Sequence, residues 1–174
     1  LGGIEFKVIT DSATRLRAVM SGQADLAYHL DGRQKPLVEK MPTLNGSVSS
    51  TIYVYQLYMN MSRKPMDDVR VRQAINHAID RQAIIDGAMF GMGTPIGSHF
   101  APHHPAYVDL TGMFPHDPAK ARALLAEAGF ADGIKATIKL PPPSYARRGG
   151  EIVAAQLREV GIDLEIQNVE WAEW

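Results

Sequence analysis

The sequence contains no cysteine. A disulfide scaffold, a thiolate metal site and a cysteine nucleophile are therefore all excluded, because each of them needs a thiol. Chains without cysteine occur in oxidising and in reducing compartments, so this absence fits any location.

An excess of charge of one sign is also lacking. The 174 residues include 18 basic and 19 acidic side chains, which gives a net charge of -1. That balance offers no electrostatic case for binding nucleic acid or an anionic membrane. No apolar run approaches the ~20 residues of a membrane span, and no charged-then-apolar leader opens the chain. The composition is that of an ordinary globular protein, long enough for one domain or for a domain and part of another.

The most informative stretch begins with the aromatic run Ile52–Asn60, whose alternation and β-forming residues predict a strand. A helix is expected next, because Pro65 favours an extended start and Asp67 or Asp68 can cap free amide groups. Apolar residues then recur at helical spacing up to Ile79. Asp80 can cap a second helix, Arg81–Met89, which Gly91 and Gly93 should end.

Three motifs in this chain resemble extracellular solute-binding proteins of family 5, the dipeptide, oligopeptide and nickel receptors of ABC importers. The first joins Met59-Asn60 and Lys64-Pro65 to Asp68-Val69-Arg70-Val71-Arg72-Gln73-Ala74-Ile75 and Ala78-Ile79-Asp80-Arg81. The second is Asp117-Pro118-Ala119-Lys120-Ala121-Arg122-Ala123-Leu124-Leu125-Ala126-Glu127-Ala128-Gly129-Phe130. The third is Gln156-Leu157-Arg158-Glu159-Val160-Gly161-Ile162-Asp163-Leu164. All three follow the family's order, and the resemblance extends from about Val8 to Trp171.

The resemblance implies an α/β fold of the type II periplasmic binding protein kind. Residues 1–61 would be the C-terminal part of the large lobe, and residues 62–174 most of the second lobe, with a hinge near Asn60. The implied function is capture of a peptide or similar small solute for an ABC transporter, without catalysis and without a cofactor. The protein would act in the periplasm or outside the cell, with permease subunits at the membrane as partners. Because Leu1 is not an initiator methionine, we expect a piece of a longer secreted protein.

The remaining sequence alternates helix and strand signals. Strands are expected at Ile4–Thr10 and Ala24–Tyr28, as a parallel pair around a short helix that starts at Asp11-Ser12. A short helix is expected within Asp31–Met41, and the long strand at Ser49–Met61. Residues 92–116, rich in proline and glycine, predict an irregular segment. The expected elements after that segment are a helix from Asp117-Pro118 to Gly129, a strand at Ile134–Leu140, a helix from about Tyr145 or Gly150 to Val160, and a strand at Ile162–Val169.

A small-solute receptor needs aromatic walls and a few oriented polar groups. In the family, the strand that resembles Tyr53–Tyr58 runs along the cleft between lobes. Gln56 and Tyr58 are therefore the first candidates for ligand contact, and Tyr53 and Tyr55 are the next. The alternative is that these tyrosines only form the aromatic face of a sheet. The family often holds the charged ends of its ligand with residues beyond the position of Trp171.

Six histidines raise the alternative of a nickel-type metal protein. His99, His103 and His104 lie in one segment, and neutral imidazoles are good ligands for transition metals. No carboxylate stands near them at a recognised ligand spacing, so solvated loop histidines are the preferred interpretation. His77, inside a predicted helix, is expected to pack or to lie at the surface.

The other charged residues have structural interpretations. Arg70 and Arg72 are expected to pair with Asp67 or Asp80, and Arg147 and Arg148 to lie solvated in a loop. No Gly-x-Ser-x-Gly motif is present, which argues against a hydrolase triad. A ligand-sensing module of a gene regulator stays open as a further alternative, since such folds are also found fused to DNA-binding domains.

Overall fold

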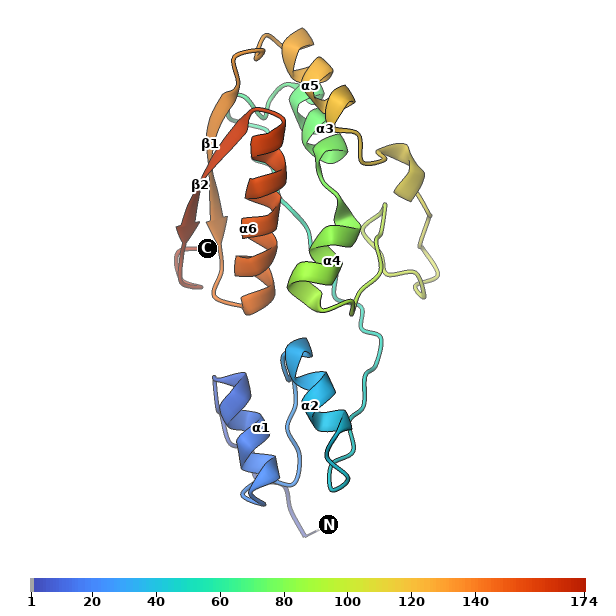
Figure 1. Cartoon of the computed structure of the whole chain (residues 1–174), viewed down its shortest axis with the longest axis vertical. Coiled ribbons are helices and arrows are strands. Elements are labelled where there is room, and N and C mark those ends of the chain that lie inside the picture. Colours follow the sequence, from blue (N-terminus) through green and yellow to red (C-terminus); the bar gives the residue numbers. More distant parts are fainter. Residues whose placement is uncertain (1) are drawn as a thin grey trace. The chain divides into compact units, whose positions relative to one another are not determined.

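The computed structural model describes residues 2–174 and divides into two compact units, the residues up to Ser50 and Thr51–Trp174. Both units contain helices, and the second also contains a parallel strand pair (Figure 1). The mixed α/β class predicted from the sequence is therefore confirmed.

The first unit is built on a short helix, α1 (Ser12–Met20). The Asp11 carboxylate accepts a hydrogen bond from the Thr14 amide at 2.8 Å and so begins the helix where predicted. The helix buries Leu16 and Ala18. A 3-10 turn, η1 (Gly32–Gln34), then leads into α2 (Lys35–Glu39), which is the short helix expected within residues 31–41.

The predicted strands of the first half of the chain are wrong. Among residues 2–174 the only strands are β1 (Ile134–Leu140) and β2 (Ile162–Asn168), so Ile4–Thr10, Ala24–Tyr28 and Ser49–Met61 form no ladder. Alternation shows that a segment could present one apolar face, whereas a strand also needs a neighbour for its backbone N–H and C=O groups. The apolar side chains of the first segment are left exposed, at 73% for Ile4, 88% for Phe6 and 94% for Val8.

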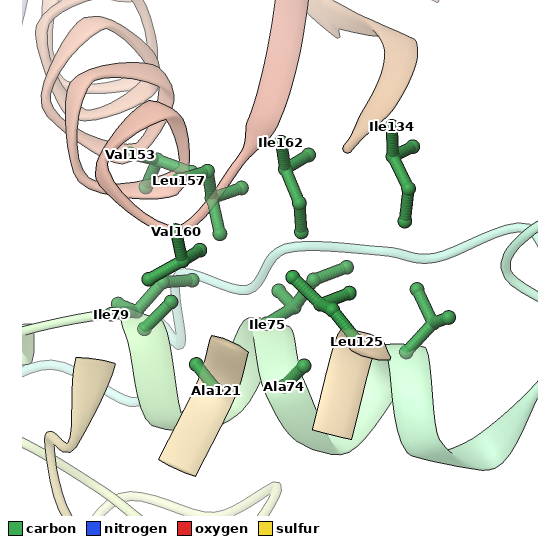
Figure 2. Close-up of a cluster of buried hydrophobic side chains, with 12 residues drawn as sticks. Ala74, Ile75, Ile79, Ala121, Leu125, Ile134, Val153, Leu157, Val160 and Ile162 are labelled. Carbon is green, nitrogen blue, oxygen red and sulfur yellow. The ribbon is translucent and has the colours of Figure 1, made fainter. Parts of the chain in front are cut away.

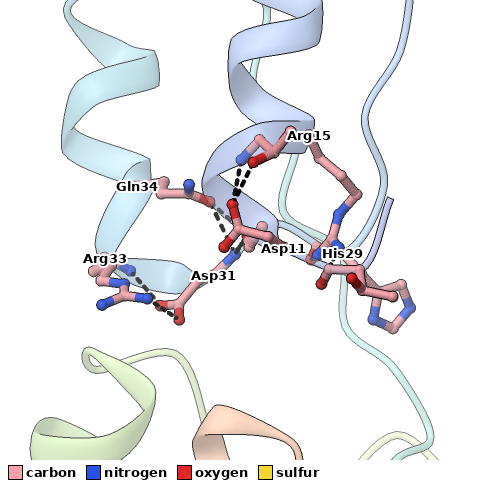
Figure 3. Close-up of polar contacts among 9 residues, drawn as sticks. Asp11, Arg15, His29, Asp31, Arg33 and Gln34 are labelled. Atoms are coloured by element: carbon pink, nitrogen blue, oxygen red, sulfur yellow. Dashed lines mark hydrogen bonds and ion pairs between the residues drawn. The ribbon is translucent and has the colours of Figure 1, made fainter. Parts of the chain in front are cut away.

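Side chains, rather than a ladder, connect the segments of the first unit. The Arg15 guanidinium donates to the backbone carbonyls of Ile9 (2.7 Å), Thr10 (3.0 Å) and His29 (2.7 Å). The Ser12 hydroxyl donates to Gln34 Oε1 at 2.7 Å and accepts from the Asp31 amide at 2.8 Å (Figure 3). The segment before α1 is thus tied to the segment after it through one arginine.

The second unit has three helices that begin at an aspartate, each at the predicted position. Asp68 precedes α3 (Val69–Ala78), Asp80 precedes α4 (Arg81–Met89) and Asp117 precedes α5 (Pro118–Glu127). In each case the carboxylate accepts from an amide of the first turn. Helix α4 ends at Phe90 and Gly91, which both take a positive φ. Between α4 and α5 the chain is irregular apart from the short turn η2 (Thr111–Met113), as expected.

The strands β1 and β2 pair in parallel, with Ile134 opposite Ile162 and Leu140 opposite Asn168. Helix α6 (Ser144–Glu159) connects them, because parallel neighbours need a crossover. Each strand directly follows a glycine, Gly133 or Gly161, and a Cβ on Gly133 would stand 2.7 Å from the Gly161 carbonyl oxygen. The two strands, the helix between them and α5 agree with the predicted elements to within a few residues.

One apolar cluster holds the second unit together. Helices α3, α5 and α6 and both strands contribute to it, and they meet around Leu125, Leu157 and Ile162, which are at most 2% exposed (Figure 2). Burial of such side chains stabilises the fold by roughly 1.5–3 kcal/mol each relative to exposure. The full set is Val71, Ala74, Ile75, Ala78, Ile79, Ala121, Leu125, Ile134, Val153, Leu157, Val160 and Ile162.

Candidate ligand-binding site

The four candidate ligand residues lie on the segment that starts the second unit. This segment pairs with no strand, and its tyrosines are open to solvent, at 61% exposure for Tyr53, 51% for Tyr55 and 75% for Tyr58. Exposed aromatic rings of this kind can stack on a ligand without prior rearrangement of a core.

Tyr55 reaches the start of α6. Its ring lies 4.1 Å from the ring of Tyr145, centroid to centroid, with 44° between the planes. Partial burial raises the pKa of both phenols, so both stay neutral and keep their hydroxyl proton at neutral pH. The pair is an uncharged aromatic surface formed by residues from two distant parts of the chain.

Gln56, the next residue, reaches the irregular segment between α4 and α5. Its Nε2 atom lies 2.7 Å from Nδ1 of His99. If the amide donates, the histidine is neutral with its proton on Nε2. Neighbouring residues of one segment thus contact two different elements, α6 through Tyr55 and the loop through Gln56.

The end of the segment is also fixed within the second unit. Met59 packs against the apolar cluster described above. Asn60 Oδ1 accepts hydrogen bonds from the amide (3.1 Å) and the hydroxyl (2.7 Å) of Ser62, which forms a local turn.

None of these tyrosines belongs to the lining of two surface hollows of the second unit. One of about 470 Å³ follows the strand pair and is lined by Lys135, Ala136, Thr137, Asp163, Leu164 and Glu165. The other, of about 300 Å³, is lined by Lys64, Asp67, Asp68, Ala128 and Phe130. Charged and polar side chains predominate in both, and Phe130 of the second hollow is the one aromatic residue in either lining, whereas a small-solute site is expected to have mainly apolar and aromatic walls.

The histidines of the loop engage other groups. His104 Nδ1 accepts from the Ala106 amide at 3.0 Å and its ring stacks on Phe100 at 4.5 Å, while His99 contacts Gln56. Over residues 2–174, no three histidine or acidic side chains come together in a way that could hold a metal ion. The structure therefore does not gather His99, His103 and His104 into a metal centre.

His77 has the packing role expected from its place in a helix. It is 2% exposed, its Nδ1 lies 2.8 Å from the Pro115 carbonyl, and its ring meets Phe114 edge to face. The Asp117 amide donates to the His77 carbonyl at 2.8 Å. This histidine thus holds the end of the irregular loop against α3.

The arginines of α3 are structural, as predicted, but their predicted partners are wrong. Arg70 pairs with Asp68 at 2.6 Å and donates to the Glu127 carbonyl, whereas Arg72 donates to the carbonyls of Met66 and Asp67. Arg70 pairs with Asp68 and not with Asp67, because Asp68 directly precedes the helix and its carboxylate points at the first turn. The Asp80 carboxylate caps α4.

The prediction that Arg147 and Arg148 lie solvated in a loop is also wrong, since both belong to the first half of α6. The Arg148 guanidinium lies over the Phe90 ring at 5.2 Å, and Arg147 is 3.9 Å from Glu170. Pro143 precedes the first residue of this helix and provides no side-chain cap. The run of three prolines at 141–143 contains none of the usual capping residues, so the sequence did not indicate where the helix begins.

The sequence pointed to the tyrosine segment as a candidate site and to His99 as a possible metal ligand, but it predicted neither the contact of Tyr55 with Tyr145 nor that of Gln56 with His99. No periodicity links these two residues to residues 55 and 56, because the contacts arise only when α6 and the loop fold onto the segment. Their residue types, one aromatic and one imidazole, were the only available signal.

Among residues 2–174, no helix is both long enough and apolar enough to cross a membrane. The model of the bacterial extracellular solute-binding proteins, family 5 (middle part), matches residues 1–174. Glutathione-binding protein GsiB of Salmonella choleraesuis is 35% identical over 167 residues, covering 95% of this chain and 32% of the relative. The chain thus spans about a third of the length of the relatives it matches.

Solved structures agree with this family in fold. DppA, an ABC transporter-associated periplasmic binding protein from Helicobacter pylori in complex with peptide STSA, superposes with a TM-score of 0.84 at 27% identity, over 96% of this chain and 32% of that one. A dipeptide-binding protein from Pseudoalteromonas sp. SM9913, in complex with Met-Leu, gives 0.82 at 25% identity, over 95% and 34%. Both are named as binding proteins, and their fold is that of periplasmic binding proteins. The chain belongs to the bacterial extracellular solute-binding proteins of family 5.

Proposed function

We propose that this chain forms part of the substrate-binding component of an ABC importer. The whole protein captures a short peptide or similar solute between two lobes and presents it to permease subunits at the membrane, without catalysing a reaction. Family membership over residues 1–174 supports this proposal. So do the names of similar proteins, which specify glutathione, Met-Leu and the peptide STSA.

The observation that carries the proposal is the exposed tyrosine segment of the second unit. Tyr58 and Tyr53 offer open rings, Tyr55 adds a half-exposed one, and Gln56 supplies an amide that can donate and accept. Aromatic surface with a few polar groups suits an uncharged peptide backbone and its side chains. We assign ligand contact to Gln56, Tyr58, Tyr53 and Tyr55.

We further propose that the two parts of the chain belong to different lobes joined by a hinge, for which the family resemblance suggests a boundary between residues 61 and 62, near Asn60. The contacts of Tyr55, Gln56 and Met59 with later residues favour an earlier position for this hinge. The end of the connecting segment moves with the second lobe, so the flexible part lies closer to Ser50, where the two compact units divide.

A titration of the natural protein that contains this chain tests the function. Glutathione and Met-Leu serve as ligands, and isothermal calorimetry gives Kd. We expect at least one of them to bind and Tyr58→Ala to weaken binding about tenfold or more, as loss of an exposed aromatic contact does. Tyr28→Ala is the matched control, because Tyr28 is similarly exposed and lies in the first unit. Equal affinity of the Tyr58→Ala variant and the unchanged protein would remove the segment from the site.

A further inference from the structure

Two contacts within the second unit converge on neighbouring residues of the tyrosine segment. Tyr55 meets Tyr145 of α6 with 4.1 Å between ring centroids, and Gln56 meets His99 of the loop with 2.7 Å between nitrogens. These four side chains, here called the 55/145–56/99 cluster, come from three separate parts of the sequence.

The cluster carries no formal charge when His99 is neutral. Burial, and then the neighbouring Tyr145 and Tyr53 side chains, raise the pKa of Tyr55, so this phenol keeps its proton at pH 7. The chemistry that remains is two aromatic faces, one amide and one imidazole. Such groups bind apolar side chains and peptide N–H and C=O groups, and they carry no formal charge that would pair with a terminal carboxylate or ammonium.

The cluster is also open. Tyr55 is 51% exposed, and the contact between Gln56 and His99 lies at the surface. A pair of aromatic rings that only held the fold together would gain most from full burial. Here half of the Tyr55 surface stays available, and Tyr53 and Tyr58 of the same segment are also exposed.

We infer that Tyr145 is a specificity-determining residue for the ligand, that His99 is a positioning residue that acts through Gln56, and that the 55/145–56/99 cluster binds an uncharged, apolar side chain of a short peptide together with the adjoining peptide group. This inference rests on the proposed function and extends it to residues outside the tyrosine segment. Tyr145 supplies the second aromatic wall. His99 orients the Gln56 amide toward the peptide group.

A comparison of two peptide probes tests this inference. The natural protein and its Tyr145→Ala variant are titrated with Met-Leu, which has large apolar side chains, and with Gly-Gly, which has none. We expect the variant to lose about tenfold in affinity for Met-Leu and much less for Gly-Gly. Tyr145→Phe keeps the ring and should bind Met-Leu as the unchanged protein does. His99→Ala should weaken both probes, because both carry a peptide group, whereas His103→Ala, in the same loop, should weaken neither.

The possible results distinguish a failure of this inference from a failure of the proposed function. A merely structural role for Tyr145 would weaken both probes by the same factor, and that result would overturn the inference. Binding of glutathione without any binding of Met-Leu would also overturn it and would leave the proposed function standing. Failure of the unchanged protein to bind glutathione, Met-Leu and Gly-Gly would count against both. If Tyr145→Ala fails to fold, Tyr145→Leu, which keeps apolar bulk and removes the ring, replaces it with the same expected ratio.

Discussion

Gln156 and Asp80 exchange two hydrogen bonds between α6 and the junction of α3 with α4. The Asp80 amide donates to Gln156 Oε1 at 3.1 Å, and Gln156 Nε2 donates to the Asp80 carbonyl at 3.3 Å. One side chain therefore satisfies both backbone groups of the residue at which the chain changes helix. The same residue caps α4 with its carboxylate.

Replacement of Gln156 by alanine should destabilise the protein by about 1–3 kcal/mol, because the partly buried Asp80 amide loses its partner and the Asp80 carbonyl keeps only the hydrogen bond from the Ile84 amide at 3.4 Å. The free energy of unfolding in urea measures the effect. Gln167→Ala is the control, since the Gln167 side chain donates to the exposed Glu165 side chain rather than to a backbone group. Equal stability of both variants would show that the exchange between Gln156 and Asp80 contributes nothing.

Substitution by alanine at two adjacent glycines of α6, Gly149 and Gly150, should change the stability of the protein in opposite directions. A Cβ on Gly150 would overlap both terminal methyl groups of Leu140, which is only 6% exposed and has little room to move. A Cβ on Gly149 would meet Ile84 at 3.7 Å and Ala88 at 3.9 Å, which are ordinary contacts.

We expect Gly150→Ala to destabilise by about 1–3 kcal/mol through overpacking. Gly149→Ala should stabilise by up to about 1 kcal/mol, because alanine is the better helix former. Thermal unfolding of the two variants, side by side, gives the sign of each change. A gain in stability for Gly150→Ala would mean that Leu140 can move aside without cost.

The carboxylate of Asp68 should make stability depend on pH in the acid range. Hydrogen bonds from the Arg70 side chain and amide lower the pKa of Asp68 from 3.8 to about 2. The folded state therefore holds this proton less tightly than the unfolded state does. The contribution of Asp68 is fully present above about pH 4 and is lost as the pH falls through about 2.

Asp68→Asn keeps a capping oxygen and removes the charge, so it isolates this effect. We expect the variant to be less stable than the unchanged protein at pH 6 and the difference to shrink toward pH 2. The midpoint of urea unfolding at several pH values measures it, and added salt should reduce it because the group is near the surface. A difference that is constant from pH 6 to pH 2 would contradict the assigned pKa.

Limited proteolysis should cut the connection between the two units before it cuts the tyrosine segment. Residues 42–51 form no helix or strand, whereas Tyr55, Gln56 and Met59 are held by later parts of the chain. With proteinase K, a protease of broad specificity, the first cleavage is expected within residues 42–51. First cleavage at residues 60–64 would place the flexible point at Asn60 instead.

Local signals predicted the second half of the fold well. The aspartates at positions 68, 80 and 117 and the glycines before each strand act within one turn, so the sequence alone carries that information. The segments Ile4–Thr10 and Ala24–Tyr28 alternate just as clearly, yet they form no strand, because pairing depends on a neighbour that alternation does not specify.

The candidate site was predictable only in part for the same reason. The tyrosine segment could be found from its residue types and from the family motifs that follow it. The contacts of Tyr55 with Tyr145 and of Gln56 with His99 depend on how α6 and the loop fold back, which no short-range pattern encodes.

Native mass spectrometry of the natural protein that contains this chain, purified without added ligand, tests the central proposal most directly. We predict a bound species with the mass of a short peptide, released on denaturation and displaced by excess Met-Leu or glutathione. A bound metal ion that persists in the His103→Ala, His104→Ala double variant would show metal binding at another site. A protein that carries no peptide and takes up neither Met-Leu nor glutathione would contradict peptide capture.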